Sequence, residues 1–202
     1  FTYYYTIPND DAYLGQIEII IRGNDSDFGR IEVSFGIITV LNNIPIITNE
    51  LSNQTANMYR SQTIQVNATI IDVEDSYPAL MAYLCVYLVE EAEWNNISMV
   101  NTGTFFEYNF TIPTNDAYLG QIQLVIRSND TDTGWVETYF GIITGLNNQP
   151  IISNERSNHS EPIYRSQIIW TNATVTDIED IYPDLTVYLC VYLLEETTWN
   201  NI

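Results

Sequence analysis

The chain has 202 residues, 46% of them hydrophobic, and a formal net charge of -20 from 26 acidic residues against six arginines and no lysine. This charge excludes binding to nucleic acid or to anionic membranes, because almost nothing could neutralise their phosphates, and the apolar content excludes a disordered chain. No apolar run reaches the roughly 18 residues that a membrane-spanning helix needs, and no signal peptide is visible. We expect any targeting or anchoring segment to lie outside this sequence.

Alternation of apolar and polar residues predicts strands rather than helices along the whole chain. In chain order, the expected strands cover residues 1–7, 16–22, 30–39, 45–49, 60–72, 80–91 and 106–112. Polar turn residues followed by proline indicate short linkers at 41–45 and 146–150. Short strands with regularly spaced turns and little helical periodicity predict an all-β fold of antiparallel β-sandwich type.

The sequence repeats with a period of 105 residues. Aligning residues 1–97 with residues 106–202 gives 60 identities in 97 positions without a gap, and the stretch YLCVYL at 83–88 returns unchanged at 188–193. A unit of about 100 residues can bury a core of its own, unlike the shorter units of solenoid proteins. We therefore expect compact domains in tandem.

Four short patterns occur in both copies: D-x-E-D at 72–75, P-x-L at 78–80, G-x-I at 15–17 and N-D-x-D-x-G at 24–29. Together they resemble the Ig-like repeats of large bacterial and archaeal surface proteins, and the resemblance covers the whole chain. The chain departs from antibody-type domains, because it lacks their intradomain disulfide and core tryptophan.

This resemblance implies tandem Ig-like domains whose boundaries cut the chain into three parts. Strands E to G of one domain would lie at 1–43, a complete domain at 44–148, and strands A to C of a third at 149–202. Neither flanking part is expected to be stable alone, because half a sandwich leaves a sheet edge and a core face bare. The simplest explanation of these incomplete domains is that the sequence covers part of a longer array of such repeats.

Eight Asn-x-Ser/Thr sequons point to N-glycosylation and an extracellular or cell-surface location. They lie at Asn24, Asn53, Asn67, Asn96, Asn109, Asn129, Asn158 and Asn172. Three pairs recur at the repeat spacing, so the alternative is that a duplication copied a few accidental sequons.

Acidic residues gather in turns that an Ig-like topology would bring to one end of a domain, next to the incoming linker. Such oxygen ligands suit Ca²⁺, which would stiffen a chain of domains, although acidic turns also serve only solubility. The candidate ligands are Asp72, Glu74, Asp75, Asp130, Asp132, Asp177, Glu179 and Asp180.

Each copy has one cysteine, so an intradomain disulfide is not expected. If the leucines and valine of YLCVYL point inward, its tyrosines and cysteine form an outward face suited to association, on the sheet opposite the sequons Asn67 and Asn109. This face comprises Tyr83, Cys85, Tyr87, Tyr188, Cys190 and Tyr192. The alternative is a half-buried, reduced cysteine under neighbouring side chains.

Nothing in the sequence indicates catalysis, since the only histidine, His159, lies in an expected turn and has no counterpart in the first copy. We expect a non-enzymatic structural glycoprotein whose repeats build an extracellular fibril, filament or cell-surface stalk. The filament could continue covalently or through half domains that complement each other between chains. The alternative function is an adhesin or carbohydrate-binding module that uses Trp94 and Trp199.

Overall fold

A computed structural model of the chain describes residues 1–53, 56–159, 161–193 and 198–201. These residues form an all-β structure, as the alternation predicts, with only three single turns of 3₁₀ helix: η1 (Asp11–Tyr13), η2 (Tyr77–Ala79) and η3 (Asp116–Tyr118). None of the described helices is long and apolar enough to cross a membrane.

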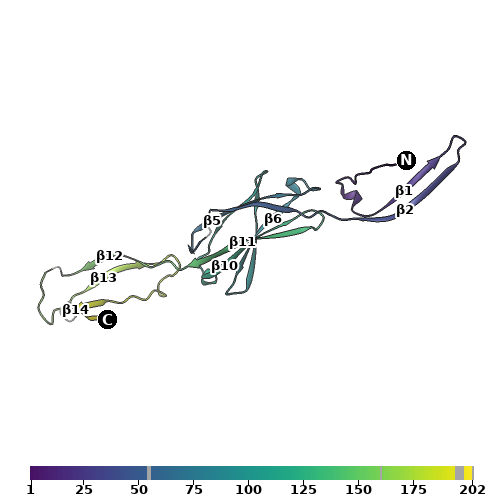
Figure 1. The fold of residues 1–202 in the computed structure, drawn as a ribbon. Coiled ribbons are helices and arrows are strands. Elements are labelled where there is room, and N and C mark those ends of the chain that lie inside the picture. The colour runs from purple at the N-terminus through teal and green to yellow at the C-terminus, as the bar shows by residue number, and fades with distance from the viewer. Residues whose placement is uncertain (54–55, 160, 194–197, 202) are drawn as a thin grey trace.

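The strands divide the chain into three parts that follow one another along an elongated molecule (Figure 1). The N-terminal hairpin contains β1 (Gly15–Asn24) and β2 (Arg30–Val40). The central body contains β3 (Ile46–Ser52), β4 (Met58–Tyr59), β5 (Thr63–Ile71), β6 (Met81–Leu88), β7 (Glu93–Ser98), β8 (Val100–Asn101), β9 (Phe106–Thr111), β10 (Gly120–Asn129) and β11 (Trp135–Leu146). The C-terminal part contains β12 (Ile151–Ser157), β13 (Thr171–Thr176), β14 (Cys190–Leu193) and β15 (Thr198–Asn201).

The central body is a sandwich-like pair of sheets. One sheet has the order β3-β5-β9-β8 and the other β4-β11-β10-β6-β7, with every neighbouring pair antiparallel except β4 and β11. Alternate residues of β5, β6 and β10 point between the sheets, where Ile64, Leu84 and Ile126 are fully buried. The period of two in the sequence therefore becomes one core face and one outer face on each sheet.

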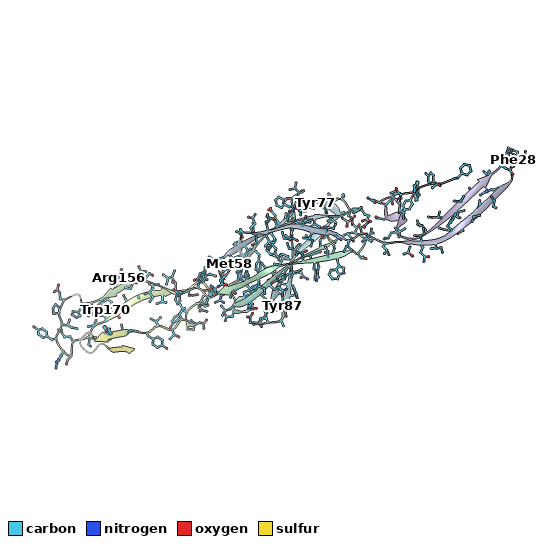
Figure 2. The ribbon with its side chains drawn as sticks, viewed as in Figure 1. Phe28, Met58, Tyr77, Tyr87, Arg156 and Trp170 are labelled. Atoms are coloured by element: carbon cyan, nitrogen blue, oxygen red, sulfur yellow. The ribbon has the colours of Figure 1, made fainter. Side chains whose placement is uncertain are left out.

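The sheets of the hairpin and of the C-terminal part pair only within themselves: β1 with β2, β12 with β13, and β14 with β15. Side chains crowd together in the central body but stand apart along the hairpin tip near Phe28 and around Trp170 (Figure 2). Irregular segments at 41–45 and 147–150 connect the three parts, at the positions where linkers are expected.

The turn between β10 and β11 depends on a close approach of backbone and carboxylate. Asp130 Oδ1 accepts from the backbone N–H groups of Asp132 at 2.9 Å and Gly134 at 2.7 Å. A Cβ at Gly134 would lie 2.1 Å from Asp130 Oδ2, so a larger residue there would have to displace the carboxylate that holds the turn. The β1–β2 turn repeats this arrangement around Asp25 and Gly29.

The structure differs from the predicted strands in two main places, and it also contains the two-residue strands β4 and β8, which were not predicted. Residues 1–7 form no strand, whereas their copy forms β9, because β9 pairs with β5 and the structure places no such strand beside residues 1–7. Strand β7 was not predicted, since its mixed sequence shows little apolar alternation, and it forms by pairing with β6 at the sheet edge.

Candidate functional site

Arg60 is the most buried charged side chain of the central body and the centre of its contact with the C-terminal part. It follows β4, and its side chain is only 2% exposed. Its Nη1 donates to the carbonyl oxygen of Thr114 at 2.8 Å and to Asp116 Oδ1 at 2.7 Å, and its Nη2 donates to Asn147 Oδ1. A planar guanidinium with five donors can hold several oxygens at once.

The opposing charge comes from Glu179, in a turn of the C-terminal part. Its side chain is 1% exposed, and Oε1 lies 3.3 Å from Arg60 Nε. The same oxygen accepts from the backbone N–H of Asn148 at 3.2 Å and from Asn148 Nδ2 at 2.5 Å. Asn148 Nδ2 also donates to the Arg60 carbonyl at 3.0 Å. Linker, central body and C-terminal part are thus joined at one buried ion pair, which we name the Arg60 junction.

The turn that presents Glu179 is held by Asp177. Its Oδ1 accepts from the backbone N–H groups of Glu179 at 2.8 Å and Asp180 at 3.2 Å. The hydrogen bond from the Glu179 backbone is the main cause that holds the pKa of Asp177 below its usual value, and nearby Arg60 acts in the same direction. The ionised Asp177 therefore fixes the turn from which Glu179 reaches Arg60.

The other end of the central body repeats this arrangement without an arginine. Glu74 Oε1 accepts from the backbone N–H of Asn43 at 3.3 Å and from Asn43 Nδ2, as Glu179 does from Asn148. Its Oε2 is buried and has no hydrogen-bond partner, as is also true of Glu179 Oε2, but no ion pair to Glu74 occurs among the described residues. We name this place the Glu74 end.

Five of the eight predicted calcium ligands, Asp72, Glu74, Asp75, Asp130 and Asp132, meet at the Glu74 end, where they mostly accept from backbone N–H groups, while Asp177, Glu179 and Asp180 lie at the Arg60 junction. Asp75 accepts from the backbone N–H and hydroxyl of Thr131, and Asp130 from Asn42 Nδ2 at 2.9 Å. Desolvation raises the pKa of Asp132, and the neighbouring carboxylates raise it further. In the described part of the chain, no three His, Cys, Asp or Glu side chains are grouped closely enough to hold a metal ion. Calcium binding stays a prediction.

An aromatic face covers the outer side of the five-stranded sheet, where the association face was predicted. Tyr83 and Tyr87 are half-buried there, and the Tyr87 ring lies 4.7 Å from that of Trp94 between centroids. The most exposed members come from β7 and β11: Trp94 at 51%, Trp135 at 58%, Tyr139 at 54% and Ile142 at 47%. Strand β11 thus supplies much of a surface that the repeated YLCVYL motif alone did not reveal.

The two cysteines differ: Cys85 fits the alternative of a reduced cysteine covered by neighbouring side chains, whereas Cys190 is exposed, as the association face predicts. Cys85 is 1% exposed because Val125 of β10 and Asn96 of β7 flank it on either side, whereas Cys190 is exposed. Burial raises the pKa of the Cys85 thiol. The predicted Tyr188 and Tyr192 of the C-terminal part are exposed as well.

The native chain is expected to present one reactive thiol, because only Cys190 is accessible and thiolate is the reactive form. Titration with a colourimetric disulfide reagent at pH 8 should show one fast thiol per chain and a second only in denaturant. Cys190→Ser should remove the fast phase and Cys85→Ser should leave it unchanged. A fast phase that survives Cys190→Ser would contradict the burial of Cys85.

Six of the eight sequon asparagines are exposed, namely Asn24, Asn53, Asn96, Asn109, Asn158 and Asn172, while Asn67 and Asn129 are half-buried. Asn67 and Asn109 lie on the outer side of the four-stranded sheet, as predicted, but Asn96 pairs with Cys85 and lies on the aromatic face. The hydroxyl residues of two sequons, Thr55 and Ser160, lie outside the described residues, and so does the side chain of Trp199.

Sequence reasoning missed Arg60, although two signals could have found it. The chain has only six cationic residues against 26 acidic ones, so each arginine is scarce, and Arg60 returns unchanged as Arg165. The exposed His159 lies in an irregular segment just after β12, next to the sequon asparagine Asn158. Comparison with protein-family models and with curated proteins found no match.

Proposed function

We propose that the chain is a non-enzymatic structural glycoprotein, in which tandem Ig-like domains build an extracellular fibre or cell-surface stalk. The observation that carries this proposal is the Arg60 junction, where a buried ion pair ties one sequence repeat to the next. Two charges withdrawn from water need further hydrogen bonds, and Arg60 and Glu179 have them from Thr114, Asn147 and Asn148, although Arg60 Nε and Glu179 Oε2 themselves have no hydrogen-bond partner. Such a joint suits a protein that must keep a fixed angle between neighbouring domains.

The Arg60 junction also restrains the linker. Asn147 and Asn148 are bound on both sides, to Arg60 and to Glu179. A short linker whose polar groups are held in this way cannot act as a flexible coil, in contrast to Gly/Ser-rich linkers. The proposed fibre is therefore stiff at this joint, and calcium bound at the acidic turns would stiffen it further.

Covalent N-glycans are part of the proposal. Exposed asparagines on both outer faces of the central body, such as Asn96 and Asn109, are open to modification. A hydrated sugar coat and a net charge of -20 would keep long fibres apart from one another.

Material from the native source is expected to carry sugar at exposed sequons. Enzymatic removal of N-glycans in water enriched in oxygen-18 should lower the intact mass and leave an oxygen-18-labelled aspartate at each modified site, which peptide mapping identifies. Asn109 should be modified more fully than Asn129, because Asn129 is half-buried and its Oδ1 has no contact with solvent. Unmodified asparagine at all eight sites would overturn the glycoprotein part of the proposal.

A second candidate function, an adhesin or carbohydrate-binding module, is favoured by one observation. The half-exposed Trp94 ring lies against Tyr87 on the open aromatic face, and flat exposed aromatic rings suit stacking on sugars. This function is compatible with the structural role, because a fibre can carry binding sites along its length.

A further inference from the structure

A row of four residues crosses the outer side of the five-stranded sheet in the central body. Asn96 of β7 pairs with Cys85 of β6, Cys85 with Val125 of β10, and Val125 with Tyr139 of β11. We name these residues the Asn96 row. Cys85 and Val125 are 1% and 6% exposed, yet neither belongs to the core cluster between the sheets. Their short side chains are therefore covered by the larger residues of the aromatic face around them.

Aromatic rings lie beside the Asn96 row. Trp94 precedes Asn96 by two residues on β7, so both side chains are on the same side of the sheet and about 7 Å apart along the strand. The Trp94 ring is 51% exposed and lies 4.7 Å from the Tyr87 ring between centroids. A group attached to Asn96 thus has an open, flat apolar surface within its reach.

Asn96 is also the acceptor of a sequon whose two functional residues share this face. Ser98 follows Asn96 by two residues, so the amide and the hydroxyl lie on the outer side together, and both residues are exposed. The exposed sequon asparagine Asn109 has different surroundings on the other sheet, because it pairs with Gln65 and its neighbours two positions away on β9 are polar as well. The chain therefore offers one sequon beside aromatic rings and a matched sequon on a polar face.

We propose that the N-glycan of Asn96 packs onto the aromatic face, with its first sugars against Trp94 and its chain along the Asn96 row. This inference rests on the glycosylation in the proposed function and adds where one glycan lies and what it covers. On attachment, Asn96 Nδ2 loses a proton and bonds the anomeric carbon of a sugar carried on a lipid phosphate, which leaves. Three strand spacings, about 14 Å, separate Asn96 from Tyr139, a distance that a short oligosaccharide covers.

Sugar rings suit this surface better than a second copy of the chain does. Their C–H groups can pack on the aromatic rings, while their hydroxyl groups can bond the polar side chains of Gln123 and Arg127 on the same face. A second copy would bring one net charge of -20 against another, whereas uncharged sugar rings meet no such repulsion.

An attached glycan also has an advantage over sugars from outside. Tethering makes its binding intramolecular, with an effective concentration on the order of millimolar for a short flexible linker. A glycan on Asn96 would therefore keep the aromatic face closed to other sugars. The adhesin function and this inference consequently give opposite predictions for a chain that is modified at Asn96.

Deglycosylation of the native chain tests the proposal. The full chain, secreted by cells that N-glycosylate their proteins, is treated with an endoglycosidase without denaturant, and peptide mapping follows each site over time. The glycan of Asn96 should be released roughly threefold or more slowly than that of Asn109, because it must leave the aromatic face before the enzyme can bind it. In proteolytic peptides of the same material the two rates should agree, which excludes differences between the glycans themselves.

Two tryptophan variants locate the contact. Trp94→Leu keeps an apolar side chain on the edge strand but has no ring, so release from Asn96 should become as fast as release from Asn109. The matched control is Trp135→Leu, which removes a ring that is 58% exposed on the same face but lies two rows from Asn96, and it should keep the protection. Equal release from Asn96 and Asn109 in the native wild-type chain would overturn the proposal.

A second measurement leaves Trp94 unchanged. Under mild oxidation of the native chain, Trp94 should be oxidised roughly threefold or more slowly in the glycosylated wild type than in Asn96→Gln, because the glycan shields the ring. Asn109→Gln is the matched control and should leave the oxidation of Trp94 as it is in the wild type. Equal oxidation of Trp94 with and without the Asn96 glycan would contradict the packing.

Two further results would overturn this inference alone and leave the glycoprotein proposal standing. One is a chain modified at Asn109 but not at Asn96. The other is retention on a polysaccharide column, through Trp94, of a chain that is fully modified at Asn96. A chain that carries no sugar at any of its eight sequons would instead overturn both proposals, so the two failures are distinguishable.

Discussion

Replacing Arg60 with alanine is expected to destabilise the chain by about 3 to 5 kcal/mol, the usual cost of leaving one member of a buried ion pair without its partner. Glu179, whose side chain is 1% exposed beside Arg60, would lose its cation, and the Thr114 carbonyl and Asn147 would each lose a donor. The free energy of unfolding, measured in urea at low protein concentration, checks the prediction.

The matched control is Arg127→Ala in the same central body. Arg127 also pairs with a glutamate, at 2.6 Å from Glu137, but their side chains are 39% and 35% exposed. Exposed ion pairs contribute about 0.2 to 1 kcal/mol, so the control should be mild. Arg60→Ala combined with Glu179→Gln should recover part of the loss, because the second change removes the buried charge. An Arg60→Ala variant as stable as Arg127→Ala would contradict the buried junction.

Strands could be predicted from the sequence because alternation is a local property. Residues 16–22 and 30–39 lie in β1 and β2, and residues 80–91 include β6, where the alternation places them. Strand β7 escaped prediction because its pairing with β6, rather than its own composition, holds it in the sheet.

The burial of individual side chains could not be predicted in the same way, since it depends on which strands and sheets pack against them. Phe1 and Phe106 are the same residue at the same place in the repeat, yet their exposures are 135% and 1%. Phe106 belongs to β9, which pairs with β5 and lies across from the second sheet, while none of the described strands lies beside Phe1. Identical local sequences thus adopt different states according to the tertiary contacts available.

The candidate site, too, could be predicted from the sequence only in part. The meeting of the acidic turns at one end of the body followed from the order of the strands, and Asp75 does reach Thr131 there. The role of Arg60 required knowing that the linker passes beside it and that Glu179 arrives from the next repeat. Contacts between repeats are long-range, and no local pattern encodes them.

Alanine substitutions at two equivalent positions of the repeat, Ile126 and Ile21, should lower the free energy of unfolding by very different amounts. Ile126→Ala is expected to cost about 2 to 5 kcal/mol, because the side chain is fully buried between the sheets and its removal leaves a cavity. Ile21→Ala removes the same atoms at the same place in the repeat, but Ile21 is 58% exposed, so the cost should stay within about 0.5 kcal/mol. Urea unfolding of dilute chains checks both values. Equal costs for the two substitutions in dilute monomers would show that the N-terminal hairpin is already packed within a single chain.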